Sequence, residues 1–398
     1  MVALTESSLS VIGPSLLFEE GKMDTSATPV FKESVQGDCR FSELVEKTVP
    51  GDPSRYSIII LISQFLKSEG ASRVAEIQAK ELSKKGYSVT IYAFKSDISP
   101  IGYDIKIIDS WIQKNFSGLN TLYRALFPFN LWNSFWISSE LKKSGLIIVH
   151  QETLVIVAYF TKLFYHARVI YWHHHIADAR FLPFRARLYK LIVSPFNWSK
   201  IKKFDQVVSI SNYSRVMLRQ RKGVESIVVY DEVDLGRFNE HNFNGMSVRM
   251  KYRIKPDDPV ILFVGRIIPT KNVHSLVAAF KVVKNHLPSA KLIVAGKSYS
   301  KQYLESLMKI CDRDVIFTDF VPDEELPDYY AACDVYATCS LLEGFNMPLV
   351  EAQACGKPVV AFDIGPHKEV VKNGFLVDEG NIEKFGETLI RVLRGGRI

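Results

Sequence analysis

The chain has 398 residues with 47% hydrophobic and 23% charged residues, an ordinary globular composition whose length allows roughly two or three domains. No run approaches the ~18 apolar residues of a membrane span, and the N-terminus lacks a basic region before an apolar run, so membrane-spanning and secreted classes are disfavoured. The five cysteines show no paired spacing and fit reduced thiols, so we expect a cytoplasmic protein.

Charge is distributed unevenly around a net +7. Residues 1–50 hold four Lys/Arg and eight Asp/Glu, whereas residues 180–222 hold eleven Lys/Arg and a single acid, Asp205. The basic block predicts an anionic partner, which could be phosphate groups, a membrane surface or nucleic acid.

Residues 1–52 are rich in Ser, Thr and Glu, show no sustained periodicity and end in a Pro-Gly-Asp-Pro turn. They predict a poorly ordered tail or linker. From Tyr56 the pattern becomes α/β, beginning with the continuous apolar run 57–62, as a strand buried on both faces requires. A helix is predicted over 71–85, where apolar residues share one face.

Strands separated by helical segments continue to the end of the chain and predict parallel sheets covered on both faces. The polar stretch 236–258 marks a junction, so we expect Rossmann-like domains at 53–245 (acceptor) and 246–398 (donor), facing across a cleft. The further predicted strands are 89–94, 146–150, 169–172, 207–210, 227–230, 260–264, 291–295, 315–318, 335–338, 359–361 and 375–377.

Two cations, Arg266 and Lys271, follow the first strand of the second domain. Ligands bind at the carboxyl ends of parallel strands, where a guanidinium and an ammonium suit a diphosphate. Taken alone, two surface cations in a loop would be the simpler interpretation.

A second motif, EGFNMPLVE, runs from Glu343 to Glu351 after the predicted strand 335–338. Pro348 fits the first turn of a helix, so the amides of residues 345–347 can face a phosphate at its N-terminus. We expect Glu351 to accept hydrogen bonds from ribose hydroxyls, and Glu343 to contact the sugar or the positive charge at its anomeric carbon.

These stretches resemble the retaining glycosyltransferases with two Rossmann domains (GT-B type, family 4 or group 1), especially mannosyltransferases acting on lipid-linked oligosaccharides. The matching text includes VGRIIPTKN, AKLIVAG, the stretch from VPDEELPDYY to PHKEVV, and NGFLV, with SISNYSR, VVYDEVDLGRF and EGASRVAEIQAKELSKKGYSVT in the first half. The resemblance covers roughly residues 57–394. It implies a nucleoside diphosphate sugar donor bound by Gly70, Arg266, Lys271, Glu343, Gly344, Phe345, Asn346 and Glu351.

Two departures from the family pattern bear on this site. Ala71 follows Gly70 where the family often has two glycines, so the approach of the backbone to the sugar phosphate is altered. Asn346 replaces a frequent glycine, although its backbone N–H remains.

The segment YWHHHIAD, residues 171–178, resembles the histidine segment of those mannosyltransferases. Counting from Asp178 favours His175 and counting from the strand favours His174, so both are candidates for orienting the sugar or handling a proton. Adjacent histidines project in different directions and no second Cys/His cluster exists, so we expect no metal site. Asp-Arg-Asp at 312–314 fits a solvated turn better than a metal motif.

Residues 180–203 interleave Lys/Arg with Phe, Leu and Ile at helical spacing. Two interpretations remain open: an amphipathic helix on an anionic membrane, or a docked helix with a solvated face. Residues 122–136, with six aromatics and Arg124 as the only charge, favour the membrane. Nucleic acid is disfavoured because no recognised motif accompanies the charge.

The expected reaction transfers a hexose of mannose or glucose type from the donor to a hydroxyl of a glycan or lipid-linked acceptor. The resemblance implies retention, and we expect front-face attack with the leaving diphosphate taking the proton, without metal or cofactor. The alternatives are a nucleotide-sugar epimerase on the same fold and a non-catalytic subunit that binds nucleotide sugars. A Rossmann oxidoreductase is disfavoured because no G-x-G-x-x-G follows the first strand.

Overall fold

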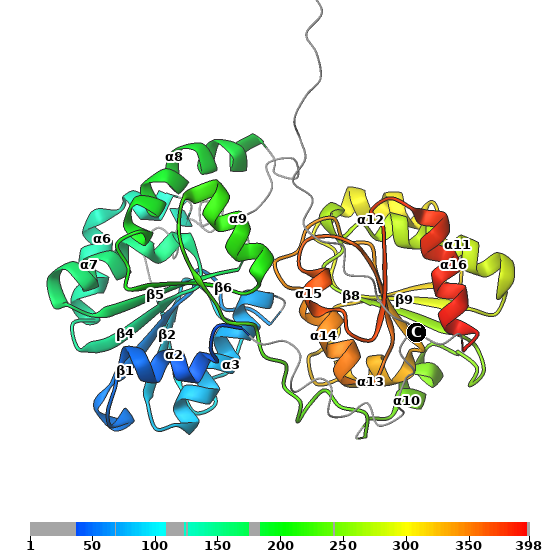
Figure 1. Ribbon diagram of the computed structural model, residues 1–398, viewed down its shortest axis with the longest axis horizontal. Helices are drawn as coiled ribbons and strands as arrows, with labels where there is room; N and C mark the ends of the chain where they lie inside the picture. Colours follow the sequence, from blue (N-terminus) through cyan, green and yellow to red (C-terminus); the bar gives the residue numbers. More distant parts are fainter. Residues whose placement is uncertain are drawn as a thin grey trace, which may run out of the picture.

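Two parallel sheets form the framework of the chain, each in its own α/β domain (Figure 1). The computed structural model describes residues 37–67, 69–108, 123–124, 126–174, 184–241 and 243–395. The first sheet has seven strands in the order β3-β2-β1-β4-β5-β6-β7, and the second has six in the order β10-β9-β8-β11-β12-β13. The prediction of two Rossmann-like domains is therefore confirmed.

Burial on both faces of the sheet explains why the strands of the first domain are continuously apolar. In β1, Ile58 and Ile60 face one apolar cluster, whereas Ile59 and Leu61 face another on the opposite side of the sheet. Both faces of the sheet are thus buried at β1, as the sequence predicts. The strands are β1 Ser57–Leu61, β2 Ser88–Ala93, β3 Asp104–Ile107, β4 Ser144–Val149, β5 Arg168–His173, β6 Gln206–Ser209 and β7 Ile227–Val228.

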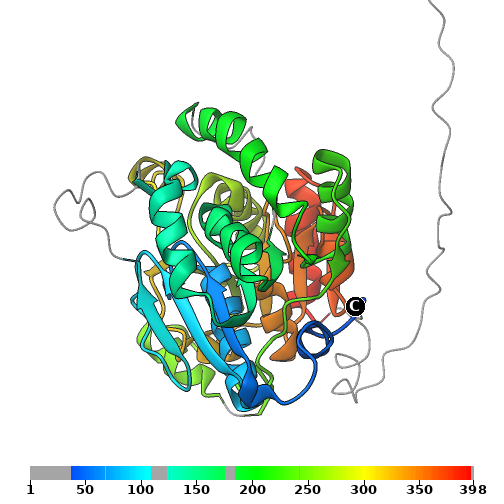
Figure 2. The same ribbon diagram turned by 90° about the vertical axis from the view of Figure 1, so that its left-hand side faces the viewer.

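The edge strand β3 has no counterpart among the sequence-predicted strands. It is only four residues long and mostly exposed, so it lacks the apolar run by which the buried strands are recognised. Helices α2 and α3 cover one face of this sheet, while α7 and α8 cover the other (Figures 1 and 2). The helices are α2 Phe41–Thr48, α3 Gly70–Lys84, α6 Leu131–Glu140, α7 Val155–Tyr165, α8 Phe184–Ile201 and α9 Asn212–Lys222, with 3-10 turns η1 Pro53–Arg55, η3 Phe127–Phe129 and η4 Glu152–Leu154.

The second domain repeats the βα pattern on its six-stranded sheet, and all its strand pairs are parallel. Its strands are β8 Val260–Val264, β9 Lys291–Ala295, β10 Val315–Asp319, β11 Val335–Thr338, β12 Val359–Phe362 and β13 Gly374–Val377. Its helices are α10 Gly245–Lys251, α11 Val273–His286, α12 Lys301–Met308, α13 Leu326–Ala332, α14 Met347–Ala354, α15 His367–Val370 and α16 Ile382–Leu393, with the 3-10 turn η6 Pro269–Lys271.

The prediction that residues 1–52 lack fixed structure is wrong for α2. Phe41, Leu44 and Val45 are buried, and the Phe41 ring meets Trp172 edge-on with ring centroids 5.5 Å apart. Just before the helix, the Asp38 N–H donates to the Val228 carbonyl at 2.8 Å. An eight-residue helix gives too few turns for its apolar spacing to stand out in the sequence, so tertiary packing decides its structure.

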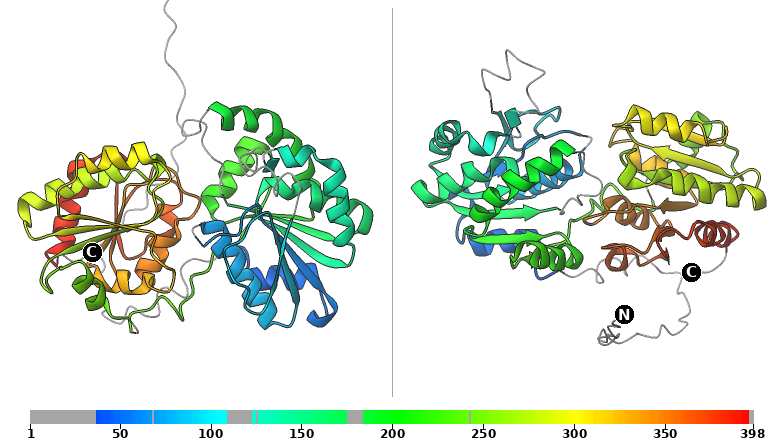
Figure 3. Two further views of the ribbon diagram at one scale, coloured as in Figure 1. Left: turned by 180° about the vertical axis from the view of Figure 1, so that it is seen from behind. Right: turned by 90° about the horizontal axis from the view of Figure 1, so that it is seen from above.

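The two domains share apolar contacts and lie side by side, as Figure 1 and both views of Figure 3 show. One buried cluster runs from the first sheet through Val229 and Phe238 of the connecting segment into the second domain. Phe238 meets Tyr330 edge-on at 5.8 Å between centroids, and the Tyr230 ring lies 5.6 Å from that of Phe345. The connection between the domains is therefore part of the core.

Candidate functional site

Lys271 and Glu343 meet at the carboxyl ends of two neighbouring strands. Lys271 ends η6 after β8, and Glu343 lies in the loop after β11, which pairs with β8. The Lys271 Nζ–Glu343 Oε1 distance is 2.5 Å, and the Leu341 N–H donates to the Thr270 carbonyl at 2.9 Å. The adjacency of the two strands thus brings together two sequence-predicted site residues.

Glu343 is held as a buried carboxylate. Burial raises the pKa of its carboxyl group, but the charge and hydrogen bond of Lys271, the nearby His367 and a hydrogen bond with Ser340 together lower the pKa below its ordinary value. Only 9% of the Glu343 side chain is exposed. The site therefore presents a fixed negative charge next to an ammonium group.

The loop between Glu343 and α14 is held from both domains. The Gly344 carbonyl accepts from the Ser211 hydroxyl at 2.8 Å, and Ser211 lies just after β6 of the first domain. Asn346 has a left-handed backbone with φ 77°, and its Nδ2 lies 2.9 Å from His367 Nε2. Asn is one of the few residues other than glycine that adopt this conformation readily.

Three backbone amides lie at the start of α14. Within the described chain, the N–H groups of Phe345, Asn346 and Met347 make no hydrogen bond. Unpaired amides at a helix N-terminus, supported by the helix dipole, form an anion-binding arrangement. The phosphate role of the loop stays a prediction.

Glu351 is engaged in a way that the sequence does not predict. It lies on α14 with no exposed surface, and its Oε1 accepts from Arg73 Nη1 of the first domain at 2.6 Å. Its Oε2 accepts from the Tyr330 hydroxyl at 2.8 Å. Arg73 also donates through Nη2 to Asp323 Oδ1 at 2.6 Å.

Arg266 and Gly70 lie at the same domain boundary. Arg266 is exposed after β8, and Gly70 begins α3 with no heavy atom within 4 Å of where a Cβ would stand. Burial raises the pKa of the neighbouring Glu69 carboxyl, and the charges of Arg266 and Arg124 oppose that rise. Charged groups from both domains thus meet beside the open start of α3.

Two histidines that follow strands of the first sheet, His150 after β4 and His174 after β5, form a chain of hydrogen bonds with a buried glutamine. His150 Nε2 lies 3.0 Å from Gln78 Oε1, and His150 Nδ1 lies 3.0 Å from His174 Nε2. Burial, together with His174, lowers the pKa of His150 well below its ordinary value, so His150 is neutral. With Gln78 as acceptor, neutral His150 donates from Nε2 and accepts from His174. His175 lies outside the described residues.

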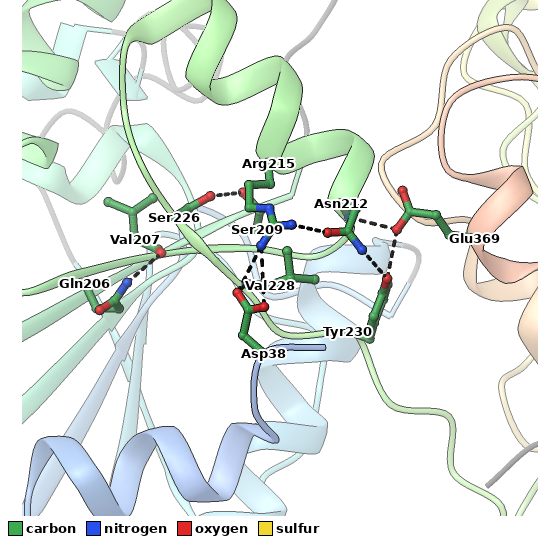
Figure 4. A network of polar contacts seen from close by, with 10 residues as sticks. All are labelled: Asp38, Gln206, Val207, Ser209, Asn212, Arg215, Ser226, Val228, Tyr230 and Glu369. Carbon is green, nitrogen blue, oxygen red and sulfur yellow. Dashed lines mark hydrogen bonds and ion pairs between the residues drawn. The ribbon is translucent and has the colours of Figure 1, made fainter. Parts of the chain in front are cut away.

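Glu369 of the second domain caps a helix of the first (Figure 4). Its carboxylate accepts from the backbone N–H groups of Asn212 and Tyr213 at 2.8 and 2.6 Å, at the start of α9. It also accepts from the Tyr230 hydroxyl at 2.9 Å. A carboxylate at a helix N-terminus is favourable, so this contact stabilises the docked domains.

Asp231, next to Tyr230, is a buried acid whose pKa is raised by burial more than Trp172 lowers it. Its side chain is 8% exposed and its Oδ1 has no hydrogen-bond partner in the described chain. Burial raises its pKa to about 7.

Arg73, His150 and Glu369 are the main site residues that the sequence analysis missed. Each lies in or just after a loop at the carboxyl end of a strand or at the domain boundary. Strand-end position was therefore the available signal, although it selects many residues. Among the described residues, no group of three His, Cys, Asp or Glu is arranged to hold a metal ion.

The fold and site together define a two-domain Rossmann protein with a glycine-containing loop, Glu343 to Met347, at the domain boundary. The family model described as Glycosyltransferase Family 4 matches residues 68–237, and the model described as Glycosyl transferases group 1 matches residues 247–397. The chain therefore belongs to the group 1 glycosyltransferases with the GT-B fold.

Curated relatives extend this similarity. The putative glycosyltransferase YtcC of Bacillus subtilis is 33% identical over 173 residues, which are 39% of this chain and 42% of the relative. A GDP-mannose-dependent alpha-(1-6)-phosphatidylinositol monomannoside mannosyltransferase of Mycobacterium tuberculosis is 28% identical over 206 residues, 48% of this chain and 52% of the relative. The chain thus matches about half the length of these relatives. The amylovoran biosynthesis glycosyltransferase AmsD of Erwinia amylovora is 25% identical, covering 85% of this chain and 90% of the relative.

Solved structures share the fold. HepE of Anabaena, in complex with UDP and glucose, superposes with a TM-score of 0.67 at 20% identity, covering 84% of this chain and 89% of that chain. Sucrose-phosphate synthase of Thermosynechococcus elongatus gives a TM-score of 0.70 at 18% identity, covering 86% of this chain and 90% of that chain. These identities establish the architecture alone.

Proposed function

We propose that this protein transfers a hexose from a nucleoside diphosphate sugar to a hydroxyl group of a glycan or lipid-linked acceptor. The observation that carries the proposal is the loop from Glu343 to Met347, which sets a buried carboxylate–ammonium pair beside three unpaired amides. The structural neighbour HepE binds UDP and glucose, and the mycobacterial relatives use GDP-mannose, which supports a nucleotide sugar as the donor.

The proposed chemistry rests on stabilising a departing diphosphate. Lys271 and Arg266 supply positive charge, and the amides before α14 supply oriented donors that need no rearrangement as charge develops. The resemblance to retaining enzymes supports front-face attack, in which the diphosphate takes the proton of the acceptor hydroxyl. We propose that the reaction needs no metal because these groups provide the compensating charge.

The acceptor would approach from the first domain, where His174 follows β5. Neutral His150 fixes one ring nitrogen of His174 by the 3.0 Å contact, and this orients the imidazole. An oriented histidine at a strand end can position a sugar hydroxyl or relay a proton. His175, the other candidate, remains a prediction.

A lipid-linked acceptor would require contact with a membrane, and the first domain carries a surface suited to one. No helix in the described ranges is long and apolar enough to cross a bilayer. We define the aromatic face as six residues of η3, α6, α7 and α8 whose rings form three contacting pairs. They are Phe129, Trp132, Phe135, Trp136, Phe164 and Phe196.

The aromatic face is both exposed and flanked by positive charge. Trp132 is 71% exposed and Trp136 56%, and a contiguous group of exposed apolar side chains marks a surface that contacts a protein or a membrane. Lys200 lies over the Phe196 ring at 4.3 Å, and Lys202 and Lys203 are exposed beyond it. Trp with Lys suits the headgroup region of an anionic bilayer, so we propose this face as the docking surface for such a membrane.

The basic segment 180–203 is described only in part. α8 begins at Phe184, and the side chains of residues 184–186 and 188–190 lie outside the described set, as do residues 180–183. Its described portion joins the aromatic face through Phe196, with Leu191 and Ile192 exposed nearby. The proposed membrane contact therefore centres on α6 and extends along α8.

The decisive experiment is a thermal-shift panel of UDP, GDP and their hexose derivatives, followed by product analysis with and without acceptor. A ligand that binds only the native state raises the melting temperature by an amount that grows with the logarithm of its concentration relative to its dissociation constant. Donor isomerisation without acceptor would indicate an epimerase, and binding with neither hydrolysis nor transfer would indicate a non-catalytic subunit. No shift with any nucleotide would refute the donor site itself.

A further inference from the structure

Arg73 covers the carboxylate that the proposed donor needs. It projects from the first turns of α3, crosses the domain boundary and places Nη1 2.6 Å from Glu351 Oε1. Its second nitrogen binds Asp323, so the guanidinium bridges two acids of the second domain. This is a bond between domains at the residue predicted to bind the ribose.

A ribose cannot reach Glu351 while the present contacts persist. The Glu351 side chain has no exposed surface, and each of its oxygens already accepts a hydrogen bond. A carboxylate has about four lone-pair positions, so its acceptor capacity is not exhausted, but a diol needs space beside it. One of the two covering side chains must therefore move.

Tyr330 is fixed, whereas Arg73 can withdraw. Tyr330 has no exposed surface and its ring packs against Phe238 and Tyr336 in the core. The Arg73 side chain is 21% exposed and belongs to the opposite domain, so a rotamer change or a small domain movement removes it. The bound ribose would then take the position of the guanidinium.

We propose that Arg73 is a placeholder for the ribose of the donor, and that a nucleoside diphosphate binds by displacing it from Glu351. The inference rests on the proposed function, because it takes Glu351 as the ribose-binding acid. It goes further by making Arg73 a residue that sets donor affinity. Donor binding must break an ion pair between domains, so occupancy of the site and the contact between domains are thermodynamically linked.

The placeholder predicts an unusual sign for a substitution in a binding site. Removing a cation near a diphosphate ordinarily weakens nucleotide binding, whereas removing a competitor strengthens it. Arg73→Ala should therefore bind UDP or GDP at least fivefold more tightly than the natural chain, measured by calorimetric titration. The matched control is Arg237→Ala, which removes the other cation near Asp323, 3.7 Å from its Oδ2, and leaves the Glu351 contact intact.

Two further measurements keep the test decisive. Asp323→Asn removes the negative charge of the second anchor of Arg73 without touching Glu351. It should therefore shift affinity in the same direction by a smaller factor, and it serves if Arg73→Ala fails to fold. The 2′-deoxy forms of UDP and GDP lack one ribose hydroxyl and should gain less affinity from Arg73→Ala. Unchanged or weaker binding in folded Arg73→Ala, with the natural chain binding normally, overturns the placeholder alone. Absence of nucleotide binding in every variant overturns the proposed donor site as well.

Discussion

Removing the Glu369 carboxylate should loosen the docking of the two domains. Glu369→Ala deletes three hydrogen bonds to the first domain, from the Asn212 and Tyr213 amides and the Tyr230 hydroxyl. At about 1.5 kcal/mol for a hydrogen bond to a charged group, the three sum to roughly 4.5 kcal/mol. The three bonds share one carboxylate and are not additive, so we expect about half of this, ~2 kcal/mol or about thirtyfold in the ratio of docked to separated molecules.

Small-angle scattering and limited proteolysis of the segment between β7 and α10 would measure the change. Glu369→Ala should show a larger radius of gyration and faster cleavage of that segment. The matched control is Lys368→Ala, at the residue next to Glu369. The Lys368 side chain is 70% exposed, and its Nζ lies 3.1 Å from Asp363 Oδ2 within the second domain. Scattering and cleavage identical to the natural chain in Glu369→Ala would refute the claim that this contact holds the domains together.

Four other outcomes are expected. Arg266→Ala and Lys271→Ala should each weaken binding of UDP or GDP by tenfold or more, because each removes charge from the proposed diphosphate pocket; unchanged affinity in both, by titration, would contradict the site. Transfer activity should survive EDTA, and loss that a divalent ion restores would show a metal requirement. Trp132→Ser with Trp136→Ser should abolish flotation with liposomes containing anionic lipid, while equal flotation of the natural chain on neutral liposomes would exclude the charge contribution. Asp231 has a folded pKa raised from 3.8 to about 7, so its contribution to the unfolding free energy falls as pH rises from about 4 to 7, by up to about 4 kcal/mol. Asp231→Asn should remove this pH dependence of the unfolding free energy. If urea unfolding gives the same difference in unfolding free energy between pH 5 and pH 8 for both proteins, the reasoning is wrong.

The strands and the donor motif follow from local sequence because their signals are local. Continuous apolar runs identify strands buried on both faces, and the placement of Glu343 after a strand and before a helix follows from Pro348 and the residues around it. The pairing of Lys271 with Glu343 needs one further fact, that β8 lies beside β11, which chain order does not supply.

Contacts between the domains could not be predicted in this way. The bond from Arg73 to Glu351 joins residues 278 positions apart, and the bond from Glu369 to Asn212 joins residues 157 apart. Neither follows from periodicity or from a spacing rule, since both depend on how two separately formed sheets are oriented. The prediction for residues 1–52 was wrong at α2 for a related reason. The helix is stabilised by packing, as of Phe41 on Trp172, and its own eight residues give too weak a signal.

The apolar cluster that passes through Val229 and Phe238 has a consequence for how the molecule melts. A connection made of solvated chain would let each domain unfold with its own midpoint, but here separating the domains exposes core surface of both. We therefore expect one calorimetric transition, with equal van't Hoff and calorimetric enthalpies, in place of two. By the same reasoning, a chimera that joins one domain to the matching domain of a relative should fold only when the connecting segment and the aromatic residues that it contacts come from the same protein. The two domains are thus separate in topology but form one folding unit.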